Sequence, residues 1–152
     1  MLQCTRADLI LTRLGVFARG AIFAIGLACF TNAGGVAEES SAYIVEVSDV
    51  AVKVGEHSVL LATLRTRDGY RILHSYNNRV IKLSSEDDSV AFDREMVPAT
   101  VQDETLTFAI GLRATKSGKH PINGLFRVGY IHGADEMAMV SLRLIANVTG
   151  TE

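Results

Sequence analysis

Alternation of large apolar side chains with polar or small ones dominates this chain after residue 42, and the spacing of an amphipathic helix is hard to find. The clearest run is 105–114, where one alternate set consists of four large apolar residues: Leu106, Phe108, Ile110 and Leu112. A period of two places such a set on one face of a β-strand. The pattern therefore predicts a half-buried strand here and an all-β chain.

Turn signals separate the other alternating stretches. We expect strands at residues 50–54, 59–66, 70–75, 79–84, 89–92, 105–114, 122–131 and 137–148. Asn77-Asn78 predicts a tight turn between two of these strands, and Pro98 places residues 95–100 at a sheet edge or in a connection. Seven to eight short strands are typical of an antiparallel β-sandwich.

The first 37 residues have a different character. Arg6, Arg13 and Arg19 accompany a single acid, Asp8, and the apolar run 20–30 follows. This pattern predicts a signal helix, residues 1–37, removed after Ala37 to leave a β-sandwich domain at 38–152. The apolar run would rise only about 16 Å as a helix, which is about half the thickness of a hydrocarbon core. The alternative is an uncleaved membrane anchor, which could span the membrane only if residues 14–18 and Arg19 also belonged to the helix.

The two cysteines, Cys4 and Cys29, both lie in this segment. Leu27-Ala28-Cys29 resembles a lipidation motif, although Gly26 stands where a large aliphatic residue is expected, so lipidation at Cys29 stays open. Cleavage after Ala37 would remove both thiols and exclude a disulfide, a thiolate nucleophile and a cysteine metal ligand from residues 38–152. We expect a periplasmic or secreted protein, with a membrane-anchored form as the alternative.

The net charge and the absence of common motifs exclude several classes of function. The 15 basic residues against 17 acidic ones give a net charge of -2, so no basic field favours nucleic acid. We find no Gly-x-Ser-x-Gly, no phosphate-binding glycine loop and no His-Glu-x-x-His, and therefore expect no catalytic residues and no cofactor. The acidic run Glu86-Asp87-Asp88 lacks the spacing of a calcium loop, which favours a solvated loop.

One grouping has the chemistry of a metal site. His132, Met137 and Met139 combine imidazole and thioether ligands, which suit Cu(I) in an exported protein. The alternative is that the two methionines pack in the core and that His132 belongs to a polar turn.

Another grouping has the composition of a protein interface. Tyr70, Arg71, Tyr76 and Arg79 surround two predicted turns, and aromatic residues and arginine dominate binding energies at interfaces. The alternative is that the tyrosines cover the edge of the sandwich and that the arginines are solvated.

Several segments carry a resemblance to a known family. Residues 59–73 (VLLATLRTRDGYRIL) contain Asp68-Gly69-Tyr70 at a strand end, and 80–83, 106–112 and 126–130 follow as further strands. These segments, within residues 44–148, resemble the N-terminal periplasmic domain of DsbD-type thiol-disulfide interchange proteins. The resemblance implies an immunoglobulin-like sandwich in the bacterial periplasm that passes electrons from a membrane partner to periplasmic acceptors.

The resemblance transfers no catalytic residue. The family's redox cysteine pair follows the tyrosine-ended strand, and residues 131–136 (IHGADE) contain no cysteine. We therefore expect a non-enzymatic exported module that binds a periplasmic or membrane protein or assists assembly. The alternatives are an accessory of thiol-disulfide exchange that uses cysteines of another chain, and a periplasmic copper carrier.

Overall fold

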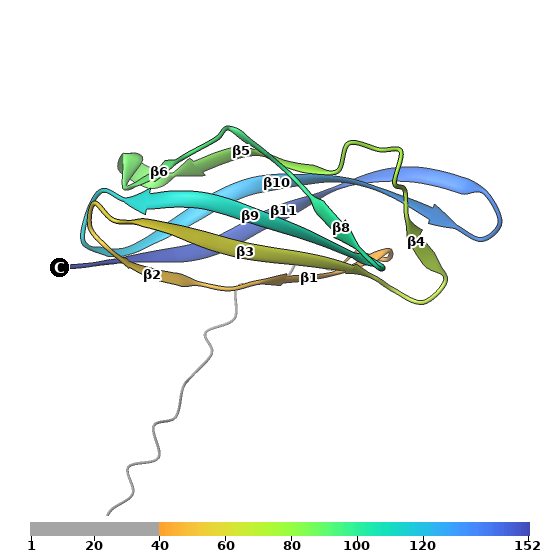
Figure 1. Ribbon diagram of the computed structural model, residues 1–152, viewed down its shortest axis with the longest axis horizontal. Helices are drawn as coiled ribbons and strands as arrows, with labels where there is room; N and C mark the ends of the chain where they lie inside the picture. Colours follow the sequence, from red (N-terminus) through yellow and green to blue (C-terminus); the bar gives the residue numbers. More distant parts are fainter. Residues whose placement is uncertain (1–39) are drawn as a thin grey trace, which may run out of the picture. The chain divides into compact units, whose positions relative to one another are not determined.

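The computed structural model describes residues 40–152, which form an all-β fold (Figure 1). Its strands are β1 (Tyr43–Val47), β2 (Val50–Lys53), β3 (His57–Thr66), β4 (Tyr70–Ile72), β5 (Arg79–Ser85), β6 (Val90–Phe92), β7 (Met96–Pro98), β8 (Thr100–Gln102), β9 (Thr105–Ala114), β10 (Gly118–His132) and β11 (Glu136–Thr151). A short 3-10 turn, η1 (Glu86–Asp88), joins β5 to β6. The predicted signal segment 1–37, with Cys4, Cys29 and the cleavage position, lies outside the described residues.

The strands form two sheets. The five-stranded sheet has the order β1-β3-β9-β6, with β8 also paired to β9. The six-stranded sheet has the order β2-β11-β10-β5-β7, with β4 also paired to β10. Every pairing is antiparallel except that between β2 and β11, which is parallel.

The N-terminal part of the fold belongs to both sheets. After β1 pairs with β3, the chain passes through Ser48 and Asp49 and continues as β2 beside β11. A carboxylate oxygen of Asp49 accepts the backbone N–H of Asn147 at 2.8 Å, directly before the first β2–β11 pair, Val50 with Val148. Asp49 thus fixes the point at which this strand changes sheet.

The hairpin of β10 and β11 is the longest element, and its register runs without a break from His132 opposite Glu136 to Gly118 opposite Gly150. Pro121, which has no N–H, lies opposite Asn147, whose own N–H turns away from β10 toward Asp49. Backbone groups alternate in direction along an antiparallel strand. Even-numbered residues of β11 therefore bond to β10, and odd-numbered residues direct their N–H and C=O groups toward the opposite edge.

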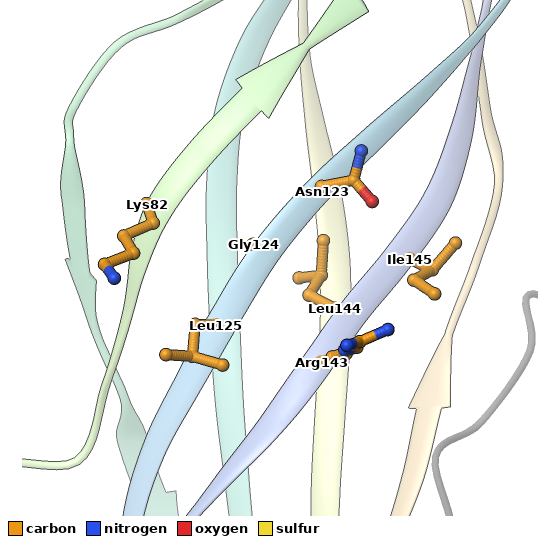
Figure 2. Close-up of a pocket in the computed structure, with 7 residues that line it drawn as sticks. All are labelled: Lys82, Asn123, Gly124, Leu125, Arg143, Leu144 and Ile145. Carbon is orange, nitrogen blue, oxygen red and sulfur yellow. The ribbon is translucent and has the colours of Figure 1, made fainter.

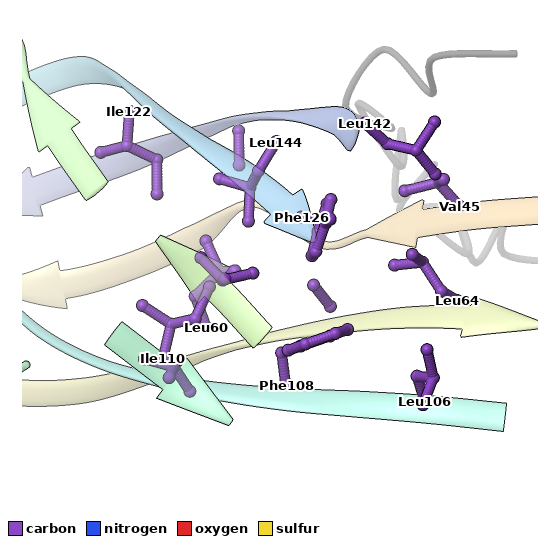
Figure 3. Close-up of a cluster of buried hydrophobic side chains, with 14 of the residues drawn as sticks. Val45, Leu60, Leu64, Leu106, Phe108, Ile110, Ile122, Phe126, Leu142 and Leu144 are labelled. Atoms are coloured by element: carbon purple, nitrogen blue, oxygen red, sulfur yellow. The ribbon is translucent and has the colours of Figure 1, made fainter. Parts of the chain in front are cut away.

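Buried side chains from both sheets meet in one hydrophobic core (Figure 3). The four apolar residues of the 105–114 run are fully buried, which confirms the predicted core face: Leu106, Phe108, Ile110 and Leu112. Phe108 of one sheet contacts Phe126 of the other, with ring centroids 5.1 Å apart. Aromatic pairs of this kind bury large apolar areas and hold the two sheets together.

The connection between β4 and β5 differs from the prediction. Both strands pair with β10, β4 at Tyr130–His132 and β5 along Ile122–Arg127, so they form no hairpin with each other. Asn78 is only 5% exposed, and its side chain accepts the N–H of Gly129 at 2.8 Å and donates to the carbonyl of Leu73 at 3.2 Å. The prediction of a tight turn at Asn77-Asn78 is wrong, because Asn78 serves as a buried hydrogen-bonding group.

The number of strands was also underestimated, since residues 40–152 contain eleven instead of seven to eight. The strands missed include β1 and the two three-residue strands β7 and β8, which are too short for alternation to reveal. Pro98 ends β7 at the edge of the six-stranded sheet, where a missing N–H costs no ladder bond, as predicted.

Candidate functional site

Three of the four residues predicted to bind a partner share the outer face of the six-stranded sheet. Arg71 lies opposite Ile131, on the side of the sheet away from the core. The Tyr76 side chain covers Gly129, where an added Cβ would lie only 3.0 Å from the Tyr76 Cβ. The Arg79 guanidinium lies 5.8 Å from the centre of the Tyr76 ring, within the range of a cation-π contact.

The fourth, Tyr70, belongs to an aromatic row on the other side of β4. Its ring stacks on His132 with centroids 4.6 Å apart and meets Tyr130 edge-on at 5.3 Å. Tyr130 in turn meets Tyr43 edge-on at 6.4 Å. Tyr70 thus packs at the end of the sheet, in the role that the alternative interpretation gave to the tyrosines.

Arginine and methionine side chains of neighbouring strands extend this outer surface. We call it the arginine-methionine face, and it consists of Arg71, Tyr76, Arg79, Lys82, Arg127, Arg143, Ile131, Met137 and Met139. Met137 and Met139 are 62% and 61% exposed. The expectation that these methionines pack in the core, as the alternative to copper binding, is therefore wrong.

Two arginines, Arg79 and Arg127, lie close together on this face. No outward position in residues 123–131 or 137–145 carries a carboxylate, and Glu95 lies only at the rim, beside Lys82. Arg79 lies directly opposite Arg127. Like charges directly opposite each other on a sheet destabilise it. Neither of these two arginines has an ion-pair partner among residues 40–152.

A shallow depression of about 320 Å³ lies beside Lys82 and Arg143, at one end of this face (Figure 2). Its lining comes from β5, β10 and β11: Lys82, Asn123, Gly124, Leu125, Arg143, Leu144 and Ile145. Gly124 sits at an irregularity in the pairing with β5, and Lys82 has a φ of 54° there. The depression is too open to enclose a small molecule and offers apolar walls flanked by two cations.

The predicted copper ligands do not converge. His132 lies opposite Glu136, and Met137 opposite Ile131, so alternation places His132 on one face of the hairpin and both methionines on the other. His132 Nδ1 lies 3.6 Å from Glu136 Oε2. Among residues 40–152 there is also no group of three or more His, Cys, Asp or Glu side chains with metal-binding geometry.

A second polar group, which the sequence did not reveal, lies on the outer face of the five-stranded sheet. His57 Nε2 is 2.6 Å from Asp93 Oδ2, above Gly111. The pair borders a hollow of about 310 Å³ with Val59 and Arg94. Thirty-six positions separate the two residues. Ser58, the neighbouring hydroxyl in sequence, points to the opposite face of β3 and supplies no nucleophile here.

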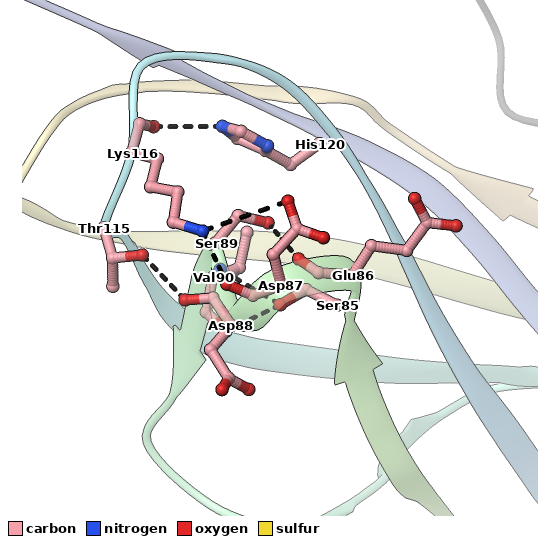
Figure 4. Close-up of polar contacts among 9 residues, drawn as sticks. All are labelled: Ser85, Glu86, Asp87, Asp88, Ser89, Val90, Thr115, Lys116 and His120. Atoms are coloured by element: carbon pink, nitrogen blue, oxygen red, sulfur yellow. Dashed lines mark hydrogen bonds and ion pairs between the residues drawn. The ribbon is translucent and has the colours of Figure 1, made fainter.

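The acidic run forms η1 and is exposed, which confirms the predicted solvated loop (Figure 4). Lys116 Nζ donates to the backbone carbonyl of Asp87 at 2.8 Å and lies 3.9 Å from its carboxylate. The Thr115 hydroxyl donates to the carbonyl of Asp88 at 2.7 Å. These bonds tie the loop to the segment that connects β9 to β10.

No family model and no curated protein matches this chain. Within residues 40–152, no helix has the length and hydropathy needed to cross a membrane.

Proposed function

We propose that this protein is an exported module of the immunoglobulin-like sandwich type, and that it binds a protein partner in the periplasm through the arginine-methionine face. Two sheets around one core support the sandwich. The N-terminal charge pattern supports export. Binding is the function that an exposed, chemically distinct sheet face supports best, because arginine, tyrosine and methionine side chains contribute most to affinity when a partner buries them.

The observation that carries this proposal is the Arg79–Arg127 pair. The two cations face each other across β5 and β10, and no described carboxylate pairs with them. Local rules for stability are broken mainly at functional sites. Arginine and aromatic residues provide most interface hot spots, and exposed methionines adapt to a partner's shape. An acidic partner surface would relieve the repulsion while it covers the methionines.

Site-specific photo-crosslinking tests the proposal. The full chain, produced from its complete coding sequence in its host, carries p-benzoylphenylalanine at Met137 or Met139. The matched control carries it at Leu61, which is 52% exposed on β3 of the other sheet. We expect a discrete protein adduct at the methionine positions and none at Leu61. Equal adducts at Leu61, or none at either methionine, would contradict the proposed function.

A further inference from the structure

We propose that the partner supplies an extended acidic segment, which adds to the free edge of β11 as an antiparallel strand. Its acidic side chains then lie on the arginine-methionine face. This inference rests on the proposed function and specifies the chemistry of the partner at the same site.

The backbone of β11 offers an edge for this addition. β2 pairs with β11 only at Val148–Thr151, and no residue among 40–152 pairs with the same edge between Met137 and Ile145. Odd-numbered residues, including Met139 and Ser141, direct their N–H and C=O groups to that edge. The edge is about 27 Å long at the usual rise of a strand.

Between Met137 and Leu142, β11 lacks the features that usually protect an edge from a further strand. Proteins usually guard an edge with a proline, a bulge or charged residues. Residues 137–142 contain no proline and no charge, and the β10–β11 register has no bulge. An unguarded edge beside a candidate binding face is the arrangement used when a peptide completes a sheet.

The outer and inner sides of the β11 edge would contact different kinds of side chain on an added strand. Arg143 and Arg127 lie on the outer side. On the inner side, β1 contacts β11, and Val140 of β11 is only partly buried against the core. A strand with acidic residues facing outward and apolar residues facing inward would complement both sides. In an antiparallel pair, the residues opposite Met139 and Ser141 face outward and also direct their N–H groups to β11.

Charge distinguishes this partner from a second copy of the chain. Pairing of β11 with β11 about a two-fold axis would join two arginine-methionine faces into one continuous surface. The joined surface would contain two copies of each cation, with no outward carboxylate on β10 or β11 between them. Like charges brought together across an interface oppose association. An acidic strand instead neutralises the face.

The test uses the full 152-residue chain and a capped twelve-residue peptide of alternating Glu and Val. We expect saturable binding, and hydrogen exchange of the Met139 and Ser141 amides at least about tenfold slower in the complex, because they become hydrogen-bonded. A peptide of alternating Lys and Val is the charge control and should not bind. Arg127→Gln should weaken binding of the acidic peptide several-fold, whereas the matched exposed change Arg113→Gln on β9 should not.

Two N-methylated peptides test the strand geometry without changing the protein. N-methylation of the Glu residues removes the N–H groups that face β11, and should abolish binding. N-methylation of the Val residues removes those that face away, and should preserve it.

The outcomes separate this inference from the proposed function. Equal tolerance of both N-methyl patterns, or binding without amide protection on β11, would overturn strand addition; adducts at Met139 would still support the proposed function. A chain that dimerises through β11, with the dimer lost in Ser141→Lys, would overturn the acidic partner in favour of self-association. Absence of peptide binding overturns the inference, and absence of adducts as well would overturn both.

Discussion

The phenol hydroxyl of Tyr43 on β1 donates a 2.7 Å hydrogen bond to the carbonyl oxygen of Gly129 on β10, and so links the two sheets. The same carbonyl also accepts the N–H of Leu73 at 3.0 Å, so it keeps one partner if the hydroxyl is removed. Tyr43→Phe should therefore lower the free energy of unfolding by about 1 kcal/mol, measured by urea denaturation. Tyr70→Phe is the matched control, and an equal loss there would contradict this role for the hydroxyl.

The same residue predicts a pH dependence. Burial, followed by the nearby Glu104 and Tyr130, raises the pKa of the Tyr43 phenol above its ordinary value. A phenol whose pKa is higher in the folded state stabilises the fold fully below its unfolded pKa, about 10, and loses that contribution as the pH rises through the folded pKa. Stability should therefore fall above about pH 10, more steeply in the parent than in Tyr43→Phe. Parallel pH profiles would contradict this assignment.

The side chain of Asn78 should contribute more to the stability of the fold than that of Asn77. Asn78→Ala removes the acceptor of the Gly129 N–H and the donor to Leu73, and leaves a buried backbone donor without a partner. We expect a loss of about 2–3 kcal/mol in the free energy of unfolding. Asn77→Ala, at an exposed position one residue earlier, should change it by less than about 0.5 kcal/mol. Similar losses in the two variants would disprove the buried role.

Two glycines in the sheets should respond differently to alanine. A Cβ at Gly150 would overlap the backbone carbonyl of Lys116, which cannot move alone. A Cβ at Gly111 would meet the carboxylate of Asp93, the end of a side chain that is 48% exposed. Gly150→Ala should cost about 2–3 kcal/mol, whereas Gly111→Ala should separate Asp93 from His57 and cost less than about 1 kcal/mol. Thermal and urea unfolding test the order, and the reverse order would refute this explanation.

Local alternation was sufficient where one face of a strand is fully buried. It predicted the core face of β9 and the turn between β10 and β11. The observed bounds of these three strands agree with the expected ones within a few residues. It failed between β4 and β5, because their partner is β10, some fifty residues later, and turn propensity reports nothing about such pairing. The Asn78 hydrogen bond belongs to that long-range pairing and has no local signal.

Only part of the arginine-methionine face could be predicted from the sequence. Sequence clustering found Arg71, Tyr76 and Arg79, which are close along the chain. Arg127 comes from β10 and was missed, since only the register places it opposite Arg79. Alternation showed that Met137 and Met139 share a face, but it does not say whether that face is the core or the solvent. The charge of a sheet surface is a property of strand order, which the sequence does not display.

The change of sheet between β1 and β2 has a mechanical consequence. β2 and β11 run in parallel, from the pair of Val50 with Val148 to that of Lys53 with Thr151. A tension that pulls on the chain before β2 and after β11 acts in opposite directions along these two strands. It therefore loads their hydrogen bonds together in shear, instead of opening them one after another. A chain stretched between a point before β1 and a point after β11 would therefore be held by this short ladder together with the β1–β3 pairing.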